Sequence, residues 1–455
     1  MNEQGKRMLQ GPLLPNIISY TIPIILTSVL QLLFNAADLV IVGRFCGSIS
    51  VAAVGATGAI TNLIINLFIG LSIGVGVTVA QGLGAKMNDT VHRLVHTAIP
   101  AALCAGLLLT VIGISFSEAL LRLMGTPENV LKLSSVYMKF YFAGMTFNML
   151  YNFAASILRA AGDTKSPLLY LSIAGVINVI LNVIFVTLIN LNVAGVALAT
   201  TISQAFSAFF LLRTLCRRTD ACRLSFSKMR FHRVELLRIV RIGLPAGIQG
   251  SLFSISNVLI QSSINSFGDV VMSGNAAAQN IEGFLYTATN AFAQSTVNFT
   301  GQNVGARQYR RVRRIIGVAL GCAIVVSSVL SVVVILFGEA ILSIYITDSA
   351  EAISYGLLRL MSVGISYCLC GIMDVSTSAL RGMGASLMPM ITSIMGVVGV
   401  RIGWVLTIFR MPQFHSPLWL YISYPVSWAF TFMVQMLAFW MVYRRHVKAY
   451  ANTLK

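Results

Sequence analysis

Residues 156–167 read SILRAAGDTKSP, and residues 378–389 read SALRGMGASLMP. The two stretches share Ser, Leu, Arg, Gly and Pro at an offset of 222 residues. Two further pairs recur at nearly the same offset: Pro23 with Pro245, and QGLGAK (81–86) with QNVGAR (302–307). Landmarks that agree in this way indicate an internal repeat. The chain is therefore predicted to consist of two similar halves.

The composition of the chain excludes an ordinary globular protein. Of 455 residues, 56% are apolar and only 10% are charged. Soluble domains carry about 25% charged residues, and soluble cores could not bury so many apolar side chains. The sequence therefore predicts a polytopic membrane protein built from helices.

Twelve stretches are predicted to cross the membrane, since a spanning helix needs about 20 apolar residues. They are 8–43, 45–85, 94–117, 140–158, two within 166–212 that break at Asn190–Asn192, 242–268, 283–306, 315–338, 360–380, 385–409 and 418–443. The predicted fold class is all-α, with 12 transmembrane helices in two pseudo-symmetric six-helix lobes.

The predicted domains are an N-terminal lobe (1–212), a basic cytoplasmic linker (213–241) and a C-terminal lobe (242–455). Because six is an even number, both lobes enter the membrane in the same direction. Transporters with such repeats bind cargo at the repeat interface near the midplane. A cleft is therefore expected between the lobes.

The basic residues indicate the orientation. There are 32 Lys and Arg against 14 Asp and Glu, a formal charge of +18. With both termini in the cytoplasm, 25 of the basic residues lie inside, as the positive-inside rule requires of a cell-membrane protein. The other seven lie outside: Arg44, Arg122, Lys132, Lys139, Arg359, Arg401 and Arg410. No basic module stands apart from the spans, so no nucleic-acid partner is expected.

The paired segments also carry a family resemblance. Gln-x-x-Gly-Ala-(Lys/Arg) follows spans two and eight, and Leu-Arg-x-x-Gly follows spans four and ten. Their order resembles the multidrug and toxic compound extrusion (MATE) family over about residues 12–445. The resemblance implies an antiporter that exports organic cations or amphipathic drugs in exchange for H+ or Na+.

Three alternatives to this function remain. A flippase for a lipid-linked or polysaccharide precursor has a similar helical make-up, but a polyanionic cargo favours embedded basic residues. Here the embedded charges are predicted to be acidic, with Arg and Lys in loops. A membrane scaffold would not need acids at membrane depth, and a channel typically concentrates identical polar rings through oligomerisation.

Three acids are predicted to lie within or at the edge of spans: Asp38, Glu282 and Asp374. An embedded acid costs about 2.5–3.5 kcal/mol on insertion scales, so each suggests a function. Asp38 shares one side of span one with Gln31 and Asn35, which are predicted to line the substrate cleft. It is predicted to bind the coupling cation or proton, and the alternative is an acid wetted at the membrane interface. The resemblance implies the same role, since Asp38 occupies the place of the family's coupling acid.

Span five carries Asn178 and Asn182 one turn apart on a shared face. In the MATE family the pattern here is commonly Asn-x-x-x-Asp, and Asn182 departs from it. Thr200 in span six matches a family Thr that completes an oxygen-lined site. Oxygen donors suit a hard cation, so Na+ at Asp38 is one prediction. The single carboxylate favours a proton instead, and the alternative role of the two Asn is to join helices.

Polar residues recur along spans seven and eight. Span eight has one every four residues: Glu282, Tyr286, Asn290, Gln294 and Asn298. Span seven has Asn257, Gln261 and Asn265. Stripes of this kind are unfavourable against lipid, so they are predicted to line the substrate cleft. The alternative is interhelical hydrogen bonding or, for Glu282 alone, stabilisation of a helix N-terminus.

Asp374 in span ten is predicted to recognise the cationic substrate in the second lobe. Its alternative role is an ion pair with Arg381, seven residues further along the helix. The resemblance supports the first role, since related proteins often carry an acid in span ten.

Other patterns argue against an enzyme. The glycine run Gly70–Gly76 lies inside a span with no preceding strand, so it predicts close helix packing rather than a phosphate loop. No nucleophile–His–acid set and no metal-ligand cluster occurs among the residue types and spacings. No cofactor is expected beyond the coupling H+ or Na+. The expected partners are small cationic or amphipathic molecules and membrane lipid, with the protein a monomer.

Overall fold

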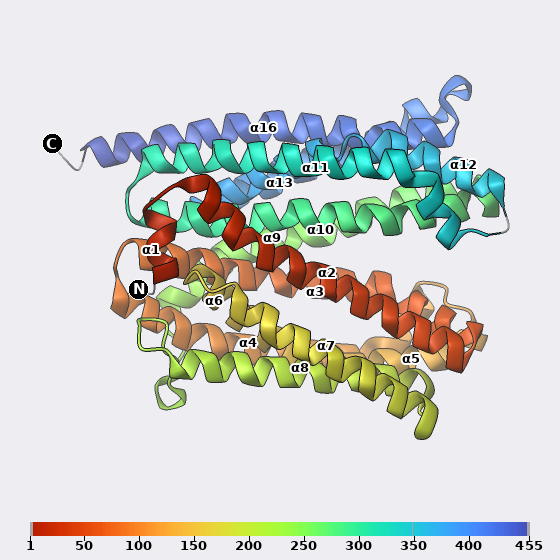
Figure 1. Cartoon of the computed structure of the whole chain (residues 1–455), viewed down its shortest axis with the longest axis horizontal. Helices are drawn as coiled ribbons and strands as arrows, with labels where there is room; N and C mark the ends of the chain where they lie inside the picture. The colour runs from red at the N-terminus through yellow and green to blue at the C-terminus, as the bar shows by residue number, and fades with distance from the viewer. Residues whose placement is uncertain (1–2, 348, 453–455) are drawn as a thin grey trace. The chain divides into compact units, whose positions relative to one another are not determined.

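The computed structural model describes residues 3–347 and 349–452, and all regular secondary structure within those residues is helical (Figure 1). The outermost residues of the two predicted lobes, including Lys455, lie outside the described residues. A short helix α1 (Glu3–Leu9) precedes the long helices.

The first half contains α2 (Leu13–Cys46), α3 (Ser48–Gly84), α4 (Asn88–Leu123), α5 (Glu128–Ala143), α6 (Met145–Ala160), α7 (Lys165–Val183) with the π-helix η1 (Ile184–Leu188), and α8 (Asn192–Arg217). The second half contains α9 (Arg233–Asn265), α10 (Asp269–Gly305), α11 (Tyr309–Tyr345), α12 (Ala350–Arg359) with η3 (Leu360–Gly364), α13 (Tyr367–Gly382), α14 (Leu387–Ser393) with η4 (Ile394–Gly399), α15 (Val400–Leu406), and α16 (Pro417–Asn452).

Eight of these helices are long and apolar enough to cross a membrane by themselves. A ninth span is formed if α12–η3 and α13, which meet at a bend of 43°, are taken together. Helices α9 and α10 fall short because polar side chains interrupt their apolar runs. The all-α prediction is confirmed, and helices lie over the predicted segments in order. The predicted span 140–158 is divided between α5 and α6, each of 16 residues.

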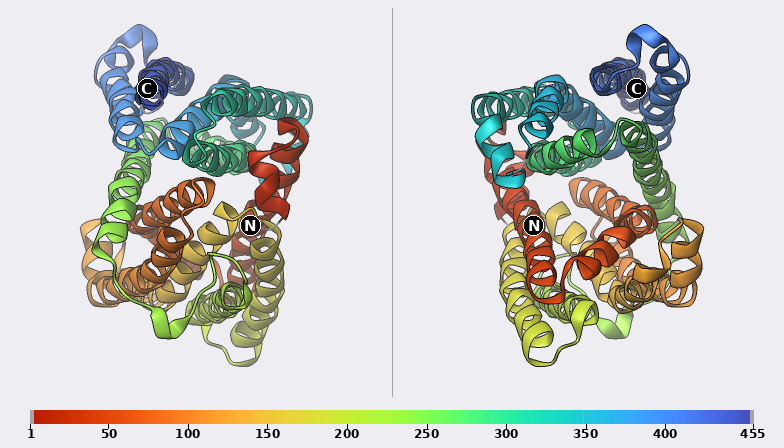
Figure 2. Two further views of the ribbon diagram at one scale, coloured as in Figure 1. Left: turned by 90° about the vertical axis from the view of Figure 1, so that its left-hand side faces the viewer. Right: turned by 90° about the vertical axis from the view of Figure 1, so that its right-hand side faces the viewer.

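The chain divides into two compact units. One comprises Met1–Gln10 and Ile22–Ser251, and the other comprises Gly11–Thr21 and Leu252–Lys455. Within each unit the helices group into a bundle, as the end-on views show (Figure 2). Helix α2 contributes to both units, and its change of unit falls next to Pro23.

The internal repeat is visible in backbone geometry. Helices α3 and α10 are both 37 residues long, and each ends where the following basic residue takes a left-handed conformation. That residue is Lys86 (φ 56°) in the first half and Arg307 (φ 57°) in the second. The next amide nitrogens, of Met87 and Gln308, bond back to Gly82 and Asn303 at 3.0 and 2.8 Å. Equal turns at equal positions confirm the predicted repeat.

The break predicted inside 166–212 is also confirmed. Asn190 and Asn192 both have positive φ, at 58° and 52°, and helix η1 ends before them. Asn tolerates the left-handed region better than most residues, so these two residues end one helix and allow the next to begin.

The glycine run in α3 packs against α9, as predicted. A Cβ on Gly70 would lie 2.2 Å from the backbone nitrogen of Gly247, and one on Gly74 would lie 2.3 Å from the carbonyl oxygen of Ile239. A Cβ on Gly243 would lie 2.6 Å from the Cα of Leu71. Small residues on both helices therefore allow the two backbones to approach.

The linker is partly helical and bound to the first unit. Helix α8 extends to Arg217 and α9 begins at Arg233. Between them, the amide of Ser225 donates to His96 Nε2 of α4 at 3.0 Å, and the amide of His232 donates to Thr97 Oγ1 at 3.2 Å. These bonds hold the connecting segment on α4.

Candidate functional site

Three predicted residues, Asn178, Asn182 and Thr200, lie around Asp38 in the first unit. Asn182 of α7 donates from Nδ2 to Asp38 Oδ1 at 2.5 Å. Thr200 of α8 donates to Asp38 Oδ2 at 3.4 Å and accepts from Asn178 Nδ2 at 3.2 Å. Asn178 Oδ1 in turn accepts from Asn182 at 3.2 Å. Helices α2, α7 and α8 thus contribute to one closed polar cluster in an otherwise apolar bundle.

This Asp38 cluster contains a carboxylate whose partners are all neutral. None of the ion pairs among the described residues involves Asp38. Asn182 Oδ1 is buried and accepts no hydrogen bond within the part of the chain that the structure describes. The carboxylate and the spare oxygen of the amide that bonds it form a donor set suited to a proton or a hard monovalent cation.

The local backbone explains how α7 presents these oxygens. The π-helical segment η1 begins immediately after α7, two residues beyond Asn182. Wider turns of this kind are frequent at functional sites because they re-aim nearby side chains. Asn178 and Asn182 are both buried, which places them toward the packed side of α7.

Other residues near Asp38 differ in exposure. Gln31 and Asn35 are exposed on α2, whereas Asp38 is half-buried. The sequence analysis missed Tyr137 and Tyr141 of α5, whose stacked rings are 5.8 Å apart. Both hydroxyl groups lie within electrostatic range of the Asp38 carboxylate. Aromatic residues with polar tips inside an apolar helix were the available signal. The coupling role of the cluster stays a prediction.

In the second unit Glu282 is engaged by an arginine. Arg359 donates from Nε and Nη2 to the two carboxylate oxygens of Glu282, at 2.9 and 2.7 Å. Its Nη1 donates to Asn275 Oδ1 at 2.8 Å. Glu282 lies well inside α10, so its alternative role at a helix N-terminus is wrong.

The same polar network reaches α9. Asn275 Nδ2 donates to Gln261 Oε1 at 2.9 Å, and Gln261 Nε2 donates to Asn265 Oδ1 at 2.8 Å. Asn257 accepts from Arg401 Nη1 at 3.0 Å. The polar stripes of spans seven and eight are therefore linked by hydrogen bonds within one unit, and their role in a substrate cleft stays a prediction.

The rest of the α10 stripe lies along the helix toward Asp374. Asn290 donates to the hydroxyl of Tyr286 at 3.2 Å, and Gln294 donates to Asn290 Oδ1 at 2.9 Å. Asn298 bonds only its own helix, at the carbonyl of Gln294. Asp374 interacts with Asn290 and with the charge of Arg381, while its Oδ2 is buried without a hydrogen-bond partner among the described residues.

Two arginines correct the sequence analysis. Arg359 and Arg401 were expected in outer loops, but they belong to helices α12 and α15 and are only 2% and 3% exposed. Glu282 offsets the charge of Arg359, and aromatic faces accept both guanidinium groups: Arg401 lies 4.1 Å from the Tyr424 ring centroid. Arg359 was missed because the predicted span 360–380 begins just after it, and Arg401 lies inside the predicted span 385–409 although it was counted with the outer basic residues.

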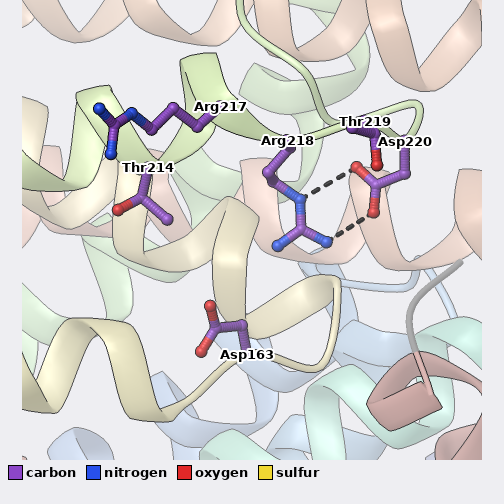
Figure 3. Close-up of a pocket in the computed structure, with 6 residues that line it drawn as sticks. All are labelled: Asp163, Thr214, Arg217, Arg218, Thr219 and Asp220. Carbon is purple, nitrogen blue, oxygen red and sulfur yellow. Dashed lines mark hydrogen bonds and ion pairs between the residues drawn. The ribbon is translucent and has the colours of Figure 1, made fainter.

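The first unit also has a cavity of about 320 Å³ at the linker end of α8 (Figure 3). Its lining residues are Asp163, Thr214, Arg217, Arg218, Thr219 and Asp220. Burial opposes ionisation of Asp220, but the two hydrogen bonds from Arg218, at 3.0 and 2.6 Å, lower the pKa of this carboxyl. Asp163 is held by Ser166. Asp220 therefore serves the local structure of the linker, and Asp163 serves that of the turn between α6 and α7.

Comparison with known proteins finds similarity over both halves of the chain. The MatE family model matches residues 23–184 and 245–405, one match in each half. A probable multidrug resistance protein of Bacillus subtilis, YoeA, is 27% identical over 423 residues, which is 91% of each chain.

Solved structures agree on the architecture. An outward-facing MATE multidrug resistance transporter of the MOP superfamily superimposes with a TM-score of 0.91 at 21% identity, covering 98% of this chain and 99% of that one. A MOP superfamily transporter from Pyrococcus furiosus, described as having a binding pocket of reverse polarity, gives a TM-score of 0.92 at 20% identity, with the same coverage.

Proposed function

The chain belongs to the MATE family of membrane transporters, and we propose that it is a secondary antiporter that exports organic cations or amphipathic drugs in exchange for H+ or Na+. The observation that carries this proposal is the Asp38 cluster. Its carboxylate has only neutral partners and an adjacent spare oxygen on Asn182. It can therefore gain and lose a small cation without leaving another buried charge uncompensated.

The coupling step follows from the contacts of Asp38. Binding of a proton or Na+ neutralises the carboxylate, which weakens its charge-assisted hydrogen bonds from Asn182 and Thr200. Helices α2, α7 and α8 can then repack around the altered cluster. Helix α2 changes unit next to Pro23, where a missing backbone hydrogen bond makes bending easier.

Exchange follows from linkage between two sites. If the repacked state binds cargo less tightly, binding of the coupling ion releases cargo on one side, and cargo binding on the other side releases the ion. One charge moving inward across 100 mV supplies about 2.3 kcal/mol. For an uncharged or zwitterionic cargo that energy corresponds to about a fiftyfold outward concentration ratio. Export of a singly charged cation cancels this charge movement, so the concentration gradient of the coupling ion then supplies the driving force.

The proposal also covers the location, orientation, oligomeric state and partners of the protein. The protein lies in the cell membrane with both termini in the cytoplasm, acts as a monomer and needs no cofactor beyond the coupling ion. Small cationic or amphipathic molecules and membrane lipid are its partners. The bias of basic residues toward the predicted inner loops supports this orientation.

The test is transport by purified protein in liposomes under an imposed pH or Na+ gradient, with a fluorescent organic cation as cargo. Asp38→Asn is expected to abolish gradient-driven uptake, since a neutral amide cannot take up either ion. Asp89→Asn, which removes an exposed acid at the start of α4, serves as the matched control and should transport normally. Wild-type rates in Asp38→Asn would refute the coupling assignment.

A second candidate, the flippase for a lipid-linked or polysaccharide precursor, gains support from one observation. Arg359 and Arg401 are buried in the second unit, where only one acid pairs with them. Translocation of a pyrophosphate-linked lipid in the same liposomes, without any ion gradient, would favour this candidate over the antiporter.

A further inference from the structure

The second unit carries an unbalanced buried charge. Glu282 neutralises Arg359 through two hydrogen bonds. Arg401 forms no ion pair within residues 3–347 and 349–452, and its electrostatic neighbours are Tyr424, Cys370, Arg359 and Tyr367. The cluster therefore has one positive charge more than it has negative charges.

Neutral contacts hold the Arg401 guanidinium in place. Its Nε donates to Ser427 Oγ at 3.1 Å, and its Nη1 donates to Asn257 Oδ1 at 3.0 Å. Tyr424 and Trp428 present their rings at 4.1 and 5.9 Å from the guanidinium carbon. Hydrogen bonds and ring faces offset part of the desolvation of a buried cation, but they supply no counter-charge.

Helices α15 and α16 position the Arg401 guanidinium and its contacts. Ser427, Tyr424 and Trp428 lie on successive turns of one helix, α16. Arg401 follows the π-helical segment η4, whose wider turns change the direction of the side chains after it. The guanidinium is thus fixed by two helices before any ligand binds, as a preorganised site requires.

The site includes one exposed residue, Asn257. Because its Oδ1 accepts from Arg401, its amide NH2 is directed elsewhere as a donor. Arg359 cannot share this role, since three of its donor atoms, Nε, Nη1 and Nη2, are used by Glu282 and Asn275. Asn257 is therefore the exposed residue through which a ligand would contact the Arg401 guanidinium.

We propose that Arg401 and Asn257 form a binding site for an acidic group, the carboxylate or phosphate of an amphipathic molecule, with Tyr424 and Trp428 contacting its apolar part. A fork-shaped guanidinium matches the two oxygens of either group. The site deepens the proposed transport function, on which its role in cargo selection rests, by extending the cargo to zwitterionic and acidic amphiphiles. A lipid headgroup phosphate shares this chemistry.

The first experiment measures binding rather than transport. Wild-type protein in a detergent with a neutral headgroup is titrated with dansylglycine and with dansylglycinamide, which differ only in the acidic group, and dansyl anisotropy is recorded. Wild type should bind the acid about tenfold or more tightly than the amide, and Arg401→Gln should remove that preference. Arg410→Gln, which removes an exposed charge near the same helix, is the matched control and should keep the preference.

A second variant, Arg401→Lys, keeps the test decisive if Arg401→Gln does not fold. Arg401→Lys retains the charge without the fork, so it should keep a reduced preference for the acid. Equal affinities for acid and amide in wild type, or an unchanged preference in folded Arg401→Gln, would overturn the site. Should Arg401→Gln not fold, Arg401→Lys decides alone: a preference equal to that of wild type or absent altogether would overturn it.

Two further measurements distinguish a lipid headgroup from a free ligand, and binding at Arg401 from ion coupling at Asp38. In nanodiscs, replacing part of the zwitterionic phosphatidylcholine with anionic phosphatidylglycerol should lower the dansylglycine affinity of wild type more than that of Arg401→Gln only if the phosphate of an anionic headgroup competes for Arg401. Asp38→Asn should bind dansylglycine as wild type does while failing to transport. Normal transport by Asp38→Asn would refute the coupling proposal and leave the binding result intact.

Discussion

Two of the embedded acids, Asp38 and Glu282, lie in opposite electrostatic settings. Asp38 has neutral amide and hydroxyl donors, and a neighbouring amide oxygen without a partner. Glu282 receives two hydrogen bonds from a guanidinium that is itself buried. An acid of the first kind can exchange a small cation, whereas one of the second kind must stay ionised to neutralise its partner. Membrane depth alone therefore does not distinguish a coupling acid from a structural one.

The largest effect expected is on folding stability at Glu282. Glu282→Gln leaves Arg359 buried without a counter-charge, which should destabilise the protein by about 3–5 kcal/mol. Asp38→Asn should cost less than about 1 kcal/mol, because Asp38 neutralises no cation. Thermal unfolding in detergent compares the two variants directly. The double variant Glu282→Gln with Arg359→Met should recover much of the loss, and equal destabilisation by both single variants would remove the contrast.

A smaller effect is expected when the first cluster gains a second acid. Asn182→Asp places two carboxylates beside the same oxygens, which favours a metal cation over a single proton. Na+-driven transport should rise relative to H+-driven transport by about tenfold, or about 1.4 kcal/mol. Asn88→Asp adds the same charge at an exposed helix start and serves as the control. An unchanged ratio of the two transport rates would count against Asn182 as part of the ion site.

The smallest effect concerns one hydroxyl. Thr200→Val removes a donor to Asp38 and an acceptor for Asn178, two bonds at 3.4 and 3.2 Å. Loss of such bonds should weaken coupling-ion affinity by about 1 kcal/mol, or about fivefold. The measurement is the ion concentration at half-maximal transport. Thr187→Val removes a hydroxyl that donates to the carbonyl of Val183, one turn earlier, and should leave the half-maximal ion concentration unchanged. A shift of equal size in Thr187→Val would show that the effect does not depend on contact with Asp38.

Several features of the fold could be predicted because they are local. The turns at Lys86 and Arg307 follow from short segments of sequence, and the paired Asn residues at 190 and 192 end a helix by their own backbone preferences. The glycines of α3 predicted close packing because a missing Cβ is useful only where another backbone approaches. In each case the signal and its consequence lie within a few residues.

Arg359 and Arg401 could not be placed in this way. Their burial depends on Glu282, Tyr424 and Trp428, which lie far away in sequence and reach them only through packing of α10 and α16 against α12 and α15. An arginine in an apolar run is equally compatible with a helix end at the membrane surface. Partners distant in sequence decide between the two, because only they can offset the desolvation of the charge.

The sequence by itself determined that this protein is a twofold repeat of apolar helices and which acids lie among them, because hydrophobic runs and turn residues act locally. Tertiary structure alone decided the partner of each embedded charge. Asp38 meets amides and a hydroxyl, Glu282 meets a guanidinium, and Arg401 meets aromatic rings. The free energy of a buried charge is set by the atoms around it, and those atoms come from helices that sequence order leaves far apart.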